Sequence, residues 1–234
     1  MNSEGGSRIL ALIPAKGAST RLPRKNLAVL DGSSLLERTI IQAQDCNLFD
    51  AIAVSSEDDE ILASAAQLRV DHVIVRPKVL ARDPAGVNEV ALHALENLRE
   101  AGGYWDTLCI LLPTSPLRSY EDIQGAHEVW IRSRPKTVIS VSAYSHTPYA
   151  GLVNENGELR PLHPEQFGKK SQDVPVIFRP NGAVMFLDIK RFQKAMWYLS
   201  PPLRPYIMPA NRSIDVDSEL DLAMASLLLR SSSL

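Results

Sequence analysis

Short runs of apolar residues alternate along the chain with segments whose apolar positions recur at helical spacing. This alternation is typical of a parallel sheet whose strands are connected and covered by helices. We expect the strands at residues 8–14, 51–55, 70–75, 107–112 and 137–142. The run at 107–112, TLCILL, is continuous enough to predict a strand buried on both faces. The pattern therefore predicts an α/β fold, a mostly parallel sheet with helices on both faces.

The helical segments lie between these strands, and one more follows near the end of the chain. The first begins at about Ser34, where Ser34 and Glu37 match a capping box. We expect the others at residues 57–67, 88–100, 119–132 and 218–229. In the closing helix, the apolar positions on one face are Leu220, Ala223, Met224 and Leu227.

The alternation breaks at about residue 144. The stretch GLVNENGELRPL at 151–162 contains Asn156 and Gly157, a pair that favours the tight turn of a β-hairpin. We therefore predict an inserted hairpin or flap at about 144–180, within a single domain that spans residues 1–234. After the insertion, the apolar pattern predicts a return to the sheet at 183–187 and a short edge strand at 206–209.

Composition and charge narrow the classes of function. Apolar residues make up 45% of the 234 positions, enough for an ordinary core, and the net charge is −2. With so little net charge we expect no binding to nucleic acid or to an anionic membrane. No run approaches the ~20 apolar residues of a membrane span, and the first residues lack the apolar core of a signal peptide. Cys46 and Cys109 lack metal-ligand spacing, so we expect reduced thiols in a cytoplasmic protein.

A basic loop, residues 13–26, follows the first predicted strand, where nucleotide phosphates often bind. In its sequence, IPAKGASTRLPRKN, the cations are Lys16, Arg21, Arg24 and Lys25. Neither a P-loop nor a dinucleotide fingerprint fits, because Gly17 is the only glycine of the segment. Two interpretations remain: a solvated loop, or a phosphate cradle of backbone N–H groups, a hydroxyl and cations. The cradle would comprise Ala15, Lys16, Gly17, Ala18, Ser19, Arg21 and Lys25.

Two carboxylates precede the closing helix, Asp215 and Asp217 in SIDVDSELDL. In an extended segment, side chains at this spacing point to the same side. Such a pair can hold Mg²⁺, which prefers oxygen ligands and keeps water and substrate phosphate around it. Alternatively, Asp217 caps the helix and Asp215 is a surface residue. The presence of the basic loop favours the metal-binding interpretation, because a polyphosphate substrate needs both cationic side chains and a metal ion.

Three further motifs follow predicted strands, at positions where ligands bind in a doubly wound sheet. In LLPTSPLRS two prolines fix a turn that carries Thr114 and Ser115, either beside a ligand or as a rigid connection. In FRPNGAV, Arg179 and Asn181 suit a carboxylate or sugar hydroxyls, or they belong to a structural turn. Arg76 can bond a base carbonyl or simply end the third strand.

Taken together and in this order, the motifs resemble those of the acylneuraminate cytidylyltransferases over about residues 8–228. The motifs are IPAKGASTRLPRKN, RPKVLARD, LLPTSPLR, RPNGAV and SIDVDSELDL. The resemblance implies a Rossmann-like fold, a dimerisation lobe at 144–180 and a homodimer. It also implies a Mg²⁺-dependent reaction in which the anomeric hydroxyl of a nonulosonic acid attacks the α-phosphate of CTP. The products would be the CMP-sugar and pyrophosphate.

The resemblance also implies roles for single residues. The family binds the triphosphate with this loop, and the matching positions here are Lys16, Ser19, Lys25 and Asn26. Arg76 matches an arginine that contacts cytosine, while Arg179 and Asn181 match a turn on the sugar side. Asp215 and Asp217 match the metal-binding pair. The residues that the resemblance implies in catalysis are Lys16, Lys25, Asp215 and Asp217.

Several positions depart from the family's usual pattern, among them Ala18 and Thr20, which replace a common glycine and lysine. Lys16 stands where arginine is common, which keeps the charge but loses the bidentate fork. Leu112 stands where glutamine is common, which removes a polar contact near the sugar. The sugar is therefore left open among neuraminic, legionaminic and pseudaminic acids. Two alternatives also remain: a Kdo-type cytidylyltransferase, and a non-catalytic nucleotide-sugar binding protein of the same fold.

Overall fold

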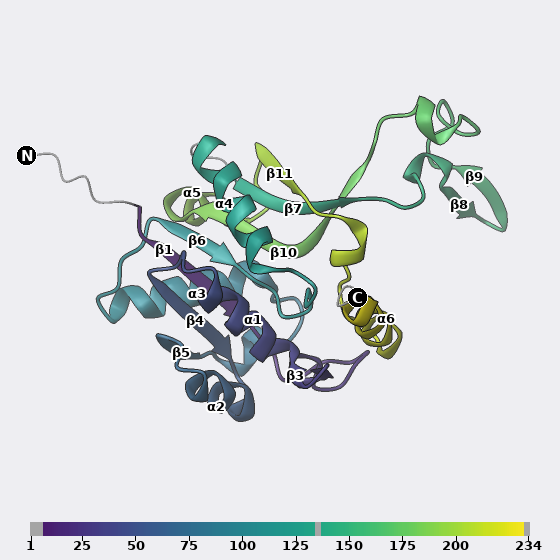
Figure 1. The fold of residues 1–234 in the computed structure, drawn as a ribbon. Coiled ribbons are helices and arrows are strands. Elements are labelled where there is room, and N and C mark those ends of the chain that lie inside the picture. Colours follow the sequence, from purple (N-terminus) through teal and green to yellow (C-terminus); the bar gives the residue numbers. More distant parts are fainter. Residues whose placement is uncertain (1–6, 134–136, 232–234) are drawn as a thin grey trace, which may run out of the picture.

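A seven-stranded sheet forms the centre of the molecule, as seen in a computed structural model that describes residues 7–133 and 137–231 (Figure 1). Its strand order is β11-β7-β10-β6-β1-β4-β5. The bounds are β1 Ile9–Pro14, β4 Ala51–Ser56, β5 His72–Val75, β6 Thr107–Ile110, β7 Thr137–Ala143, β10 Phe178–Asp188 and β11 Leu203–Ile207. All five strands predicted in the first part of the chain are therefore confirmed, with ends that differ by one or two residues.

Helices cover both faces of this sheet. Their bounds are α1 Leu35–Asp45, α2 Asp59–Gln67, α3 Val87–Glu100, α4 Tyr120–Ser133, α5 Ile189–Ala195 and α6 Glu219–Ser231. Single turns of 3₁₀ helix lie at Lys25–Leu27, Lys78–Ala81, Pro148–Ala150, Ser171–Asp173 and Ala210–Arg212. The capping box at the start of α1 is confirmed, because Glu37 N donates to Ser34 Oγ (3.1 Å) and Ser34 N donates to Glu37 Oε2 (2.7 Å).

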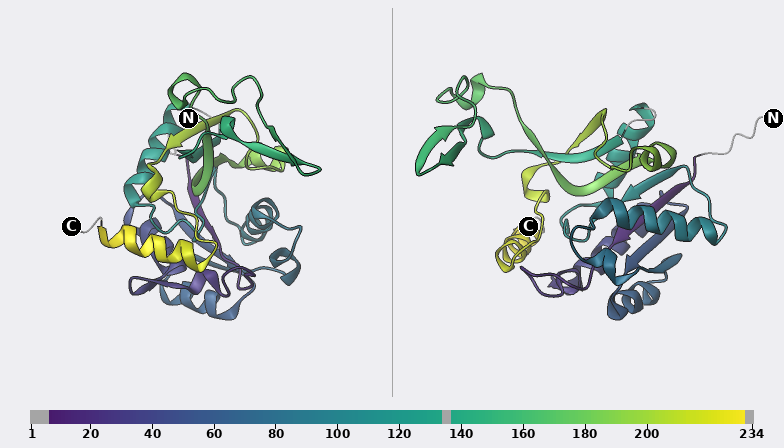
Figure 2. Two further views of the ribbon diagram at one scale, coloured as in Figure 1. Left: turned by 90° about the vertical axis from the view of Figure 1, so that its right-hand side faces the viewer. Right: turned by 180° about the vertical axis from the view of Figure 1, so that it is seen from behind.

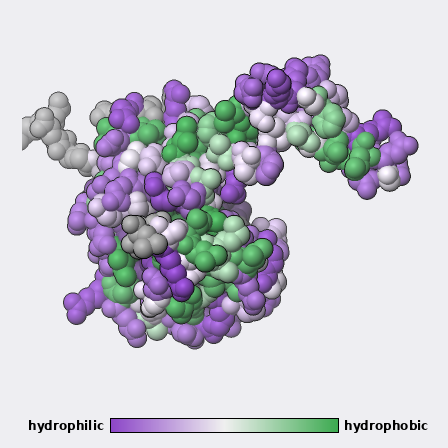
Figure 3. Space-filling view, turned by 45° about the vertical axis from the view of Figure 1, so that its right-hand side comes forward, coloured by the Kyte–Doolittle hydropathy of each residue, from purple (hydrophilic) through white to green (hydrophobic). Residues whose placement is uncertain are grey.

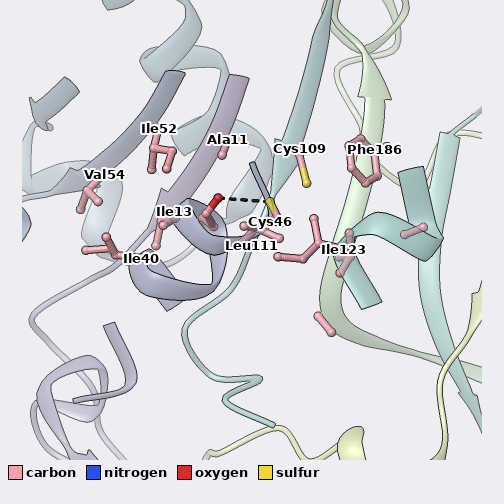
Figure 4. Packing of buried hydrophobic residues seen from close by; sticks show 14 of the residues in the cluster. Ala11, Ile13, Ile40, Cys46, Ile52, Val54, Cys109, Leu111, Ile123 and Phe186 are labelled. Carbon is pink, nitrogen blue, oxygen red and sulfur yellow. Dashed lines mark hydrogen bonds between the residues drawn. The ribbon is translucent and has the colours of Figure 1, made fainter. Parts of the chain in front are cut away.

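Successive residues of β1 enter two separate cores, which is the consequence of side chains alternating across a strand. Ala11 and Ile13 pack with buried residues of α1, α2 and α4, whereas Leu10 and Leu12 pack with those of α3 and α5. Figure 4 shows the first of these cores, in which side chains of β1, β4 and β6 meet those of α1 and α4. The expected Rossmann-like architecture, a mostly parallel sheet between two helical layers, is thus confirmed.

The second half of the sheet departs from the simple alternation. β10 runs antiparallel to both of its neighbours, β6 and β7, whereas β11 is parallel to β7 and forms the edge. The edge strand lies at Leu203–Ile207, so it begins three residues and ends two residues earlier than predicted. The seven-residue helix α5 and the small antiparallel pair β2 Val29–Leu30 and β3 Ser33–Ser34 were not predicted.

A long hairpin-bearing insertion leaves the sheet after β7 and returns at β10, where Phe178 pairs with Ala143. We call residues 144–177 the arm. Within it, β8 Leu152–Glu155 pairs with β9 Glu158–Pro161 through a turn in which Asn156 and Gly157 both have positive φ. The predicted Asn-Gly hairpin is therefore confirmed. Figures 1 and 2 show this hairpin projecting away from the sheet and its helices.

The closing helix α6 buries the opposite face from the one that the sequence singled out. Leu220, Ala223, Met224 and Leu227 share one face, as expected, but all four are exposed. The residues that pack inward are Leu222, Ala225, Leu228 and Leu229. They form a third, smaller core with Leu22 and Leu30, which fixes α6 beside the basic loop.

Two further observations concern the cysteines and the apolar character of the helices. Cys46 and Cys109 are free, buried thiols, and burial raises the pKa of both. Among the helices within residues 7–133 and 137–231, none has the length and apolar character needed to cross a bilayer.

Candidate active site

The candidate site lies at one edge of the sheet, where the parallel strands β1, β4, β5 and β6 end. Because their carboxyl ends meet at the same edge, the loops that follow them converge. A pocket opens there, which we call the first pocket. Its polar lining residues are Lys16, Lys25, Asn26, Arg76 and Thr114, and its apolar ones include Leu80, Val87, Val90 and Leu112.

The basic loop is held against the strand ends by its backbone. Ala15 N donates to the carbonyl of Ser55 (3.0 Å), and the amide of the buried Asn26 donates to the carbonyl of Lys16 (2.8 Å). At Gly17 an added Cβ would lie 2.5 Å from the carboxylate of Asp58, so only glycine fits this approach without a shift. The side chains of Lys16 and Arg21 remain exposed, while Ser19 is half-buried. The loop is thus anchored at its ends and open in its middle.

The fold brings the basic loop into direct contact with the second of the two carboxylates. Lys25 Nζ lies 2.7 Å from Asp217 Oδ1, and Arg21 Nη2 lies 2.7 Å from Asp217 Oδ2. Nearly two hundred residues of sequence separate these partners. The alternative that Asp217 caps α6 is not what the structure shows, because Ser218 and Asp221 exchange the capping hydrogen bonds.

Asp215 is the more exposed carboxylate of the pair, whereas Asp217 is half-buried. Val216 N donates to the carbonyl of Thr114 (2.7 Å), which joins this segment to the turn after β6. Partial desolvation by neighbouring atoms raises the pKa of Asp215, the Thr114 side chain acts in the opposite direction, and the nearby charge of Asp217 raises the pKa further. Asp215 therefore lies beside the turn that follows β6 and is exposed at the surface there, as the alternative of a surface residue expects.

These residues fit a Mg²⁺ ion that is shared with a substrate. Mg²⁺ is commonly bound by one or two carboxylates together with substrate phosphates and water. Among the described residues no group of three or more histidine, cysteine or acidic side chains is arranged to hold a metal. The donor set of Asp215 and Asp217, with two cations beside it, matches a site that phosphate oxygens would complete.

A second pocket adjoins the first. It is lined by Leu112, Ile139, Ser140, Pro180, Asn181, Gly182, Met185, Tyr198, Leu199 and Asp215. Leu112 lines both pockets, and the contact between Thr114 and Asp215 joins a residue of the first to a residue of the second. Two ligands bound side by side would therefore meet near Asp215.

Three of the predicted substrate residues use their side chains in hydrogen bonds within the protein. Ser115 is fully buried and donates to the carbonyl of Asn181 (2.9 Å). Asn181 donates from Nδ2 to Ser213 Oγ (2.9 Å) and accepts at Oδ1 from Ser140 Oγ (2.6 Å). Arg179 donates to the carbonyl of Ser213 (3.3 Å). These contacts match the structural-turn alternative, whereas Thr114, Arg76 and the basic loop do line the first pocket.

Glu57 is a residue of the site that the sequence motifs did not single out. It follows β4, and its Oε2 accepts from Arg76 Nε (3.0 Å) and Nη2 (2.8 Å), while its Oε1 accepts from Gly17 N (2.8 Å). Burial opposes ionisation of Glu57, but the bonds from Arg76 and from backbone N–H groups outweigh it and hold its pKa below the usual range. One carboxylate thus connects the basic loop to the arginine of the first pocket. Its place after a predicted strand was the signal that could have identified it.

Replacing Glu57 with glutamine should destabilise the folded protein by about 1–3 kcal/mol at neutral pH. The reason is that Arg76, which is only 4% exposed, would lose the charge that compensates its own. Urea denaturation of both proteins, read from the unfolding midpoint at unchanged m-value, measures this difference.

The pH dependence gives this prediction a second test. The pKa of Glu57 is lowered on folding from 4.5, so its contribution is present above that value and is lost as the pH falls through the lower, folded value. The gap between wild type and Glu57→Gln should therefore close in acid. Glu100→Gln, on an exposed turn of α3, should be within about 0.5 kcal/mol of wild type throughout. Equal stability of Glu57→Gln and wild type at neutral pH would contradict the assignment.

Comparison with known proteins places this geometry in a family. A family model described as Cytidylyltransferase matches residues 10–147, more than half of the chain. The CMP-N,N'-diacetyllegionaminic acid synthase of Legionella pneumophila is 30% identical over 230 residues, covering 95% of this chain and 96% of that protein. The pseudaminic acid cytidylyltransferase of Campylobacter jejuni is 28% identical over 222 residues, covering 94% and 96%.

A solved structure supports the fold. A CMP:2-keto-3-deoxy-manno-octonic acid synthetase complexed with CTP superimposes with a TM-score of 0.73 over 97% of this chain and 100% of that chain. At 13% identity, this likeness shows the shared architecture alone. With the family match over residues 10–147 and the full-length relatives, the chain belongs to the cytidylyltransferase family.

Proposed function

We propose that this cytidylyltransferase transfers CMP from CTP to a nonulosonic acid and releases pyrophosphate. The observation that carries the proposal is the contact of Lys25 and Arg21 with Asp217 at the edge of the first pocket. A polyphosphate needs cations and a metal-binding carboxylate at one point, and these residues supply both. The full-length relatives named for pseudaminic and legionaminic acids support the class of acceptor.

CTP would occupy the first pocket. We assign the base to the end near Arg76 and the triphosphate to the basic loop, with charge from Lys16 and Lys25. The residues expected to complete this cradle are Ala15, Gly17, Ser19, Arg21 and Asn26. The hydrogen bond from the Asn26 side-chain amide to the carbonyl of Lys16 supports this assignment, because it connects the two ends of the loop around the proposed phosphate site. The acceptor would lie in the second pocket, whose wall includes Pro180, Asn181 and Gly182, directly after Arg179.

The reaction is an in-line displacement at the α-phosphorus. The anomeric oxygen of the acceptor forms a bond to phosphorus, the bond to pyrophosphate breaks, and the hydroxyl proton leaves. Protein residues contribute mainly by positioning and by stabilising charge. Lys16 and Lys25 would bind the departing pyrophosphate, and the Asp215 carboxylate is the candidate acceptor of the proton. When bound by Asp215 and Asp217, Mg²⁺ supplies positive charge that offsets the charge of the phosphates.

A panel of pyrophosphate-release assays tests this function. Several nonulosonic acids and Kdo would each be offered with CTP, ATP, GTP and UTP, with Mg²⁺ present or chelated. We expect release with CTP and at least one nonulosonic acid. Release only with Kdo would favour the Kdo-type alternative. Nucleotide binding without release on any acceptor would favour a non-catalytic binding protein and overturn the proposal.

We further propose that the chain is a homodimer assembled through the arm. Apolar side chains on the arm are exposed, among them Leu152, Leu159, Leu162, Phe167 and Val176. Figure 3 shows hydrophobic surface on this projecting part of the molecule. Exposed apolar patches of this kind mark protein–protein contacts, and a second copy would cover them.

The double substitution Leu159→Glu with Leu162→Glu should therefore convert the dimer into a monomer of 25.8 kDa, because it would place two charges in the apolar contact. Light scattering coupled to size-exclusion chromatography measures the mass. The same two added charges on the exposed end of α2, Ala66→Glu with Gln67→Glu, should leave the dimer intact. A wild-type protein that is already monomeric, or an arm variant that remains dimeric, would contradict the proposal.

We also propose that the protein acts in the cytoplasm, where CTP is made and where cysteines such as the unpaired Cys46 and Cys109 stay reduced. Fractionation of cells that express the chain tests this location.

A further inference from the structure

Glu57 and Arg76 lie side by side because they follow neighbouring parallel strands. β4 ends at Ser56 and β5 ends at Val75, and these two residues are paired in the register. The next residue of each strand is therefore also adjacent, and Arg76 N donates to the carbonyl of Ser56 (2.9 Å). The Arg76 side chain is 3% exposed and that of Glu57 is 10% exposed. A carboxylate and a guanidinium in such contact hold each other in one orientation.

The two carboxylate oxygens of Glu57 have different partners. Oε2 accepts from Nε and Nη2 of Arg76, whereas Oε1 accepts from Gly17 N in the basic loop. Nη1 of Arg76 has no hydrogen-bond partner among the described residues, and Arg76 lines the first pocket. This nitrogen therefore remains for a ligand, and Glu57 sets its direction at the end of the pocket proposed for the base.

At its other oxygen, Glu57 fixes the point where the basic loop leaves the sheet. Gly17 packs closely on Asp58, and the bond to Oε1 of Glu57 then occupies Gly17 N. The next two backbone N–H groups, those of Ala18 and Ser19, have no acceptor within residues 7–133 and 137–231. Successive unpaired N–H groups of this kind can bind phosphate oxygens. The position of these donors thus depends on the same carboxylate that orients Arg76.

We propose that Glu57 is a positioning residue that lets the first pocket bind the base and the triphosphate of CTP at the same time. The inference rests on the proposed function and concerns how that site binds its nucleotide. A carboxylate offers one acceptor oxygen to each side, whereas a glutamine amide offers one oxygen and one NH₂ group. Glutamine at this position can accept from Arg76 or from Gly17 N, but not from both. Each half of the nucleotide would then favour a different orientation of the amide, and the two halves together would find neither orientation suitable.

The affinities of Glu57→Gln for CTP and for its two halves test this role. Calorimetric titration with Mg²⁺ present measures Kd for CTP, and competition with CTP gives Kd for cytidine and for tripolyphosphate. We expect Kd for CTP to rise roughly 10–100-fold, the effect of losing one hydrogen bond to a charged group. Kd for each half alone should change by less than about threefold, because the amide can turn to suit either one. A residue that only supports the fold would not produce this difference between the whole nucleotide and its halves.

Glu60→Gln is the matched control. It removes an exposed carboxylate that also contacts the basic loop, at Arg24 Nη2 (2.8 Å), and it accounts for the loss of a negative charge near the triphosphate. Its Kd for CTP should be within about twofold of wild type. If Glu57→Gln does not stay folded during the titration, Glu57→Asp gives the same test with the same expected result. Aspartate keeps the charge but is one methylene shorter, so it reaches one partner at a time.

A rise in Kd for CTP no larger than the product of the changes for the two halves would overturn the inference and leave the proposed function intact. An unchanged Kd for CTP would do the same. A wild-type protein that binds CTP but releases no pyrophosphate with any acceptor would refute the proposed function alone. A wild-type protein that binds neither CTP nor either half would refute both.

Discussion

Asp217→Asn should lower kcat/KM for pyrophosphate release by roughly 10²–10³-fold, the usual effect of removing one group that stabilises charge in a transition state. Asparagine keeps the shape of the side chain but removes the negative charge that Lys25 and Arg21 now contact. It also removes one of the two carboxylates that would hold Mg²⁺. The loss should appear in kcat as well as in KM, since the Asp217 carboxylate would affect both the bound triphosphate and the reacting phosphate.

Two controls make the result interpretable. Thermal unfolding should show that Asp217→Asn remains folded, because Asp217 is partly exposed and Ser218, not Asp217, caps α6. Asp59→Asn, the same change on the exposed first turn of α2, should leave the rate at the wild-type level. The Mg²⁺ concentration needed for half-maximal rate should rise in Asp217→Asn. If Asp217→Asn released pyrophosphate at nearly the wild-type rate, the Asp217 carboxylate would neither stabilise charge in the transition state nor hold Mg²⁺.

The contact between the basic loop and Asp217 could be predicted from the sequence because of the geometry of parallel strands. The apolar runs fixed the ends of β1, β5 and β6, and parallel strands place their carboxyl ends at one edge. Lys16, Arg76 and Thr114 each follow such an end, so their convergence on the first pocket needed no knowledge of side-chain packing. Asp217 reaches this edge only because the segment before α6 returns to it. The hydrogen bond from Val216 N to the carbonyl of Thr114 holds the segment there.

The sequence was less informative where two alternative packings would have the same local pattern of apolar residues. On α6, Leu220, Met224 and Leu227 recur at helical spacing, but so do Leu222, Ala225 and Leu229 on the other side. Periodicity alone cannot choose between two apolar faces. The choice is made by the third core, whose residues come from distant parts of the chain. The exposed face that results is a property of packing and not of the helix itself.

The direction of β10 explains the largest difference between the predicted site and the observed one, which is the position of Asn181. The motif FRPNGAV predicts a turn, because Pro180 and Gly182 flank Asn181, and one of its two interpretations presents Asn181 to a ligand. In the structure it lies inside β10, an antiparallel strand with an irregular register between Pro180 and Met185 and with Gly182 at φ +72°. This irregularity turns the Asn181 side chain toward Ser140 and Ser213 in the interior. Strand direction depends on where the arm returns to the sheet, and no local pattern records it.

Asn181→Leu should therefore act first on stability, with an expected loss of about 3 kcal/mol in the free energy of unfolding. Leucine has a similar volume but leaves the Ser140 hydroxyl and the Ala183 N–H without the acceptor that Asn181 Oδ1 provides. It also removes the donor to Ser213 Oγ. Urea denaturation with linear extrapolation measures the loss, and Asn97→Leu on the exposed face of α3 should change stability by less than about 0.5 kcal/mol.

The same variant separates the two interpretations of the RPNGAV motif. If Asn181 only supports the wall of the second pocket, lowering the temperature until Asn181→Leu is fully folded should restore most of the activity, with KM for the acceptor changed by less than about tenfold. If its amide bonds the sugar, KM should remain at least roughly 10²-fold higher in the folded variant, because a site that loses its hydrogen bond to a substrate hydroxyl discriminates strongly. The paired bonds of Asn181 lead us to expect the first result, in which this asparagine shapes the sugar site through Ser140 and Gly182 without contacting the sugar.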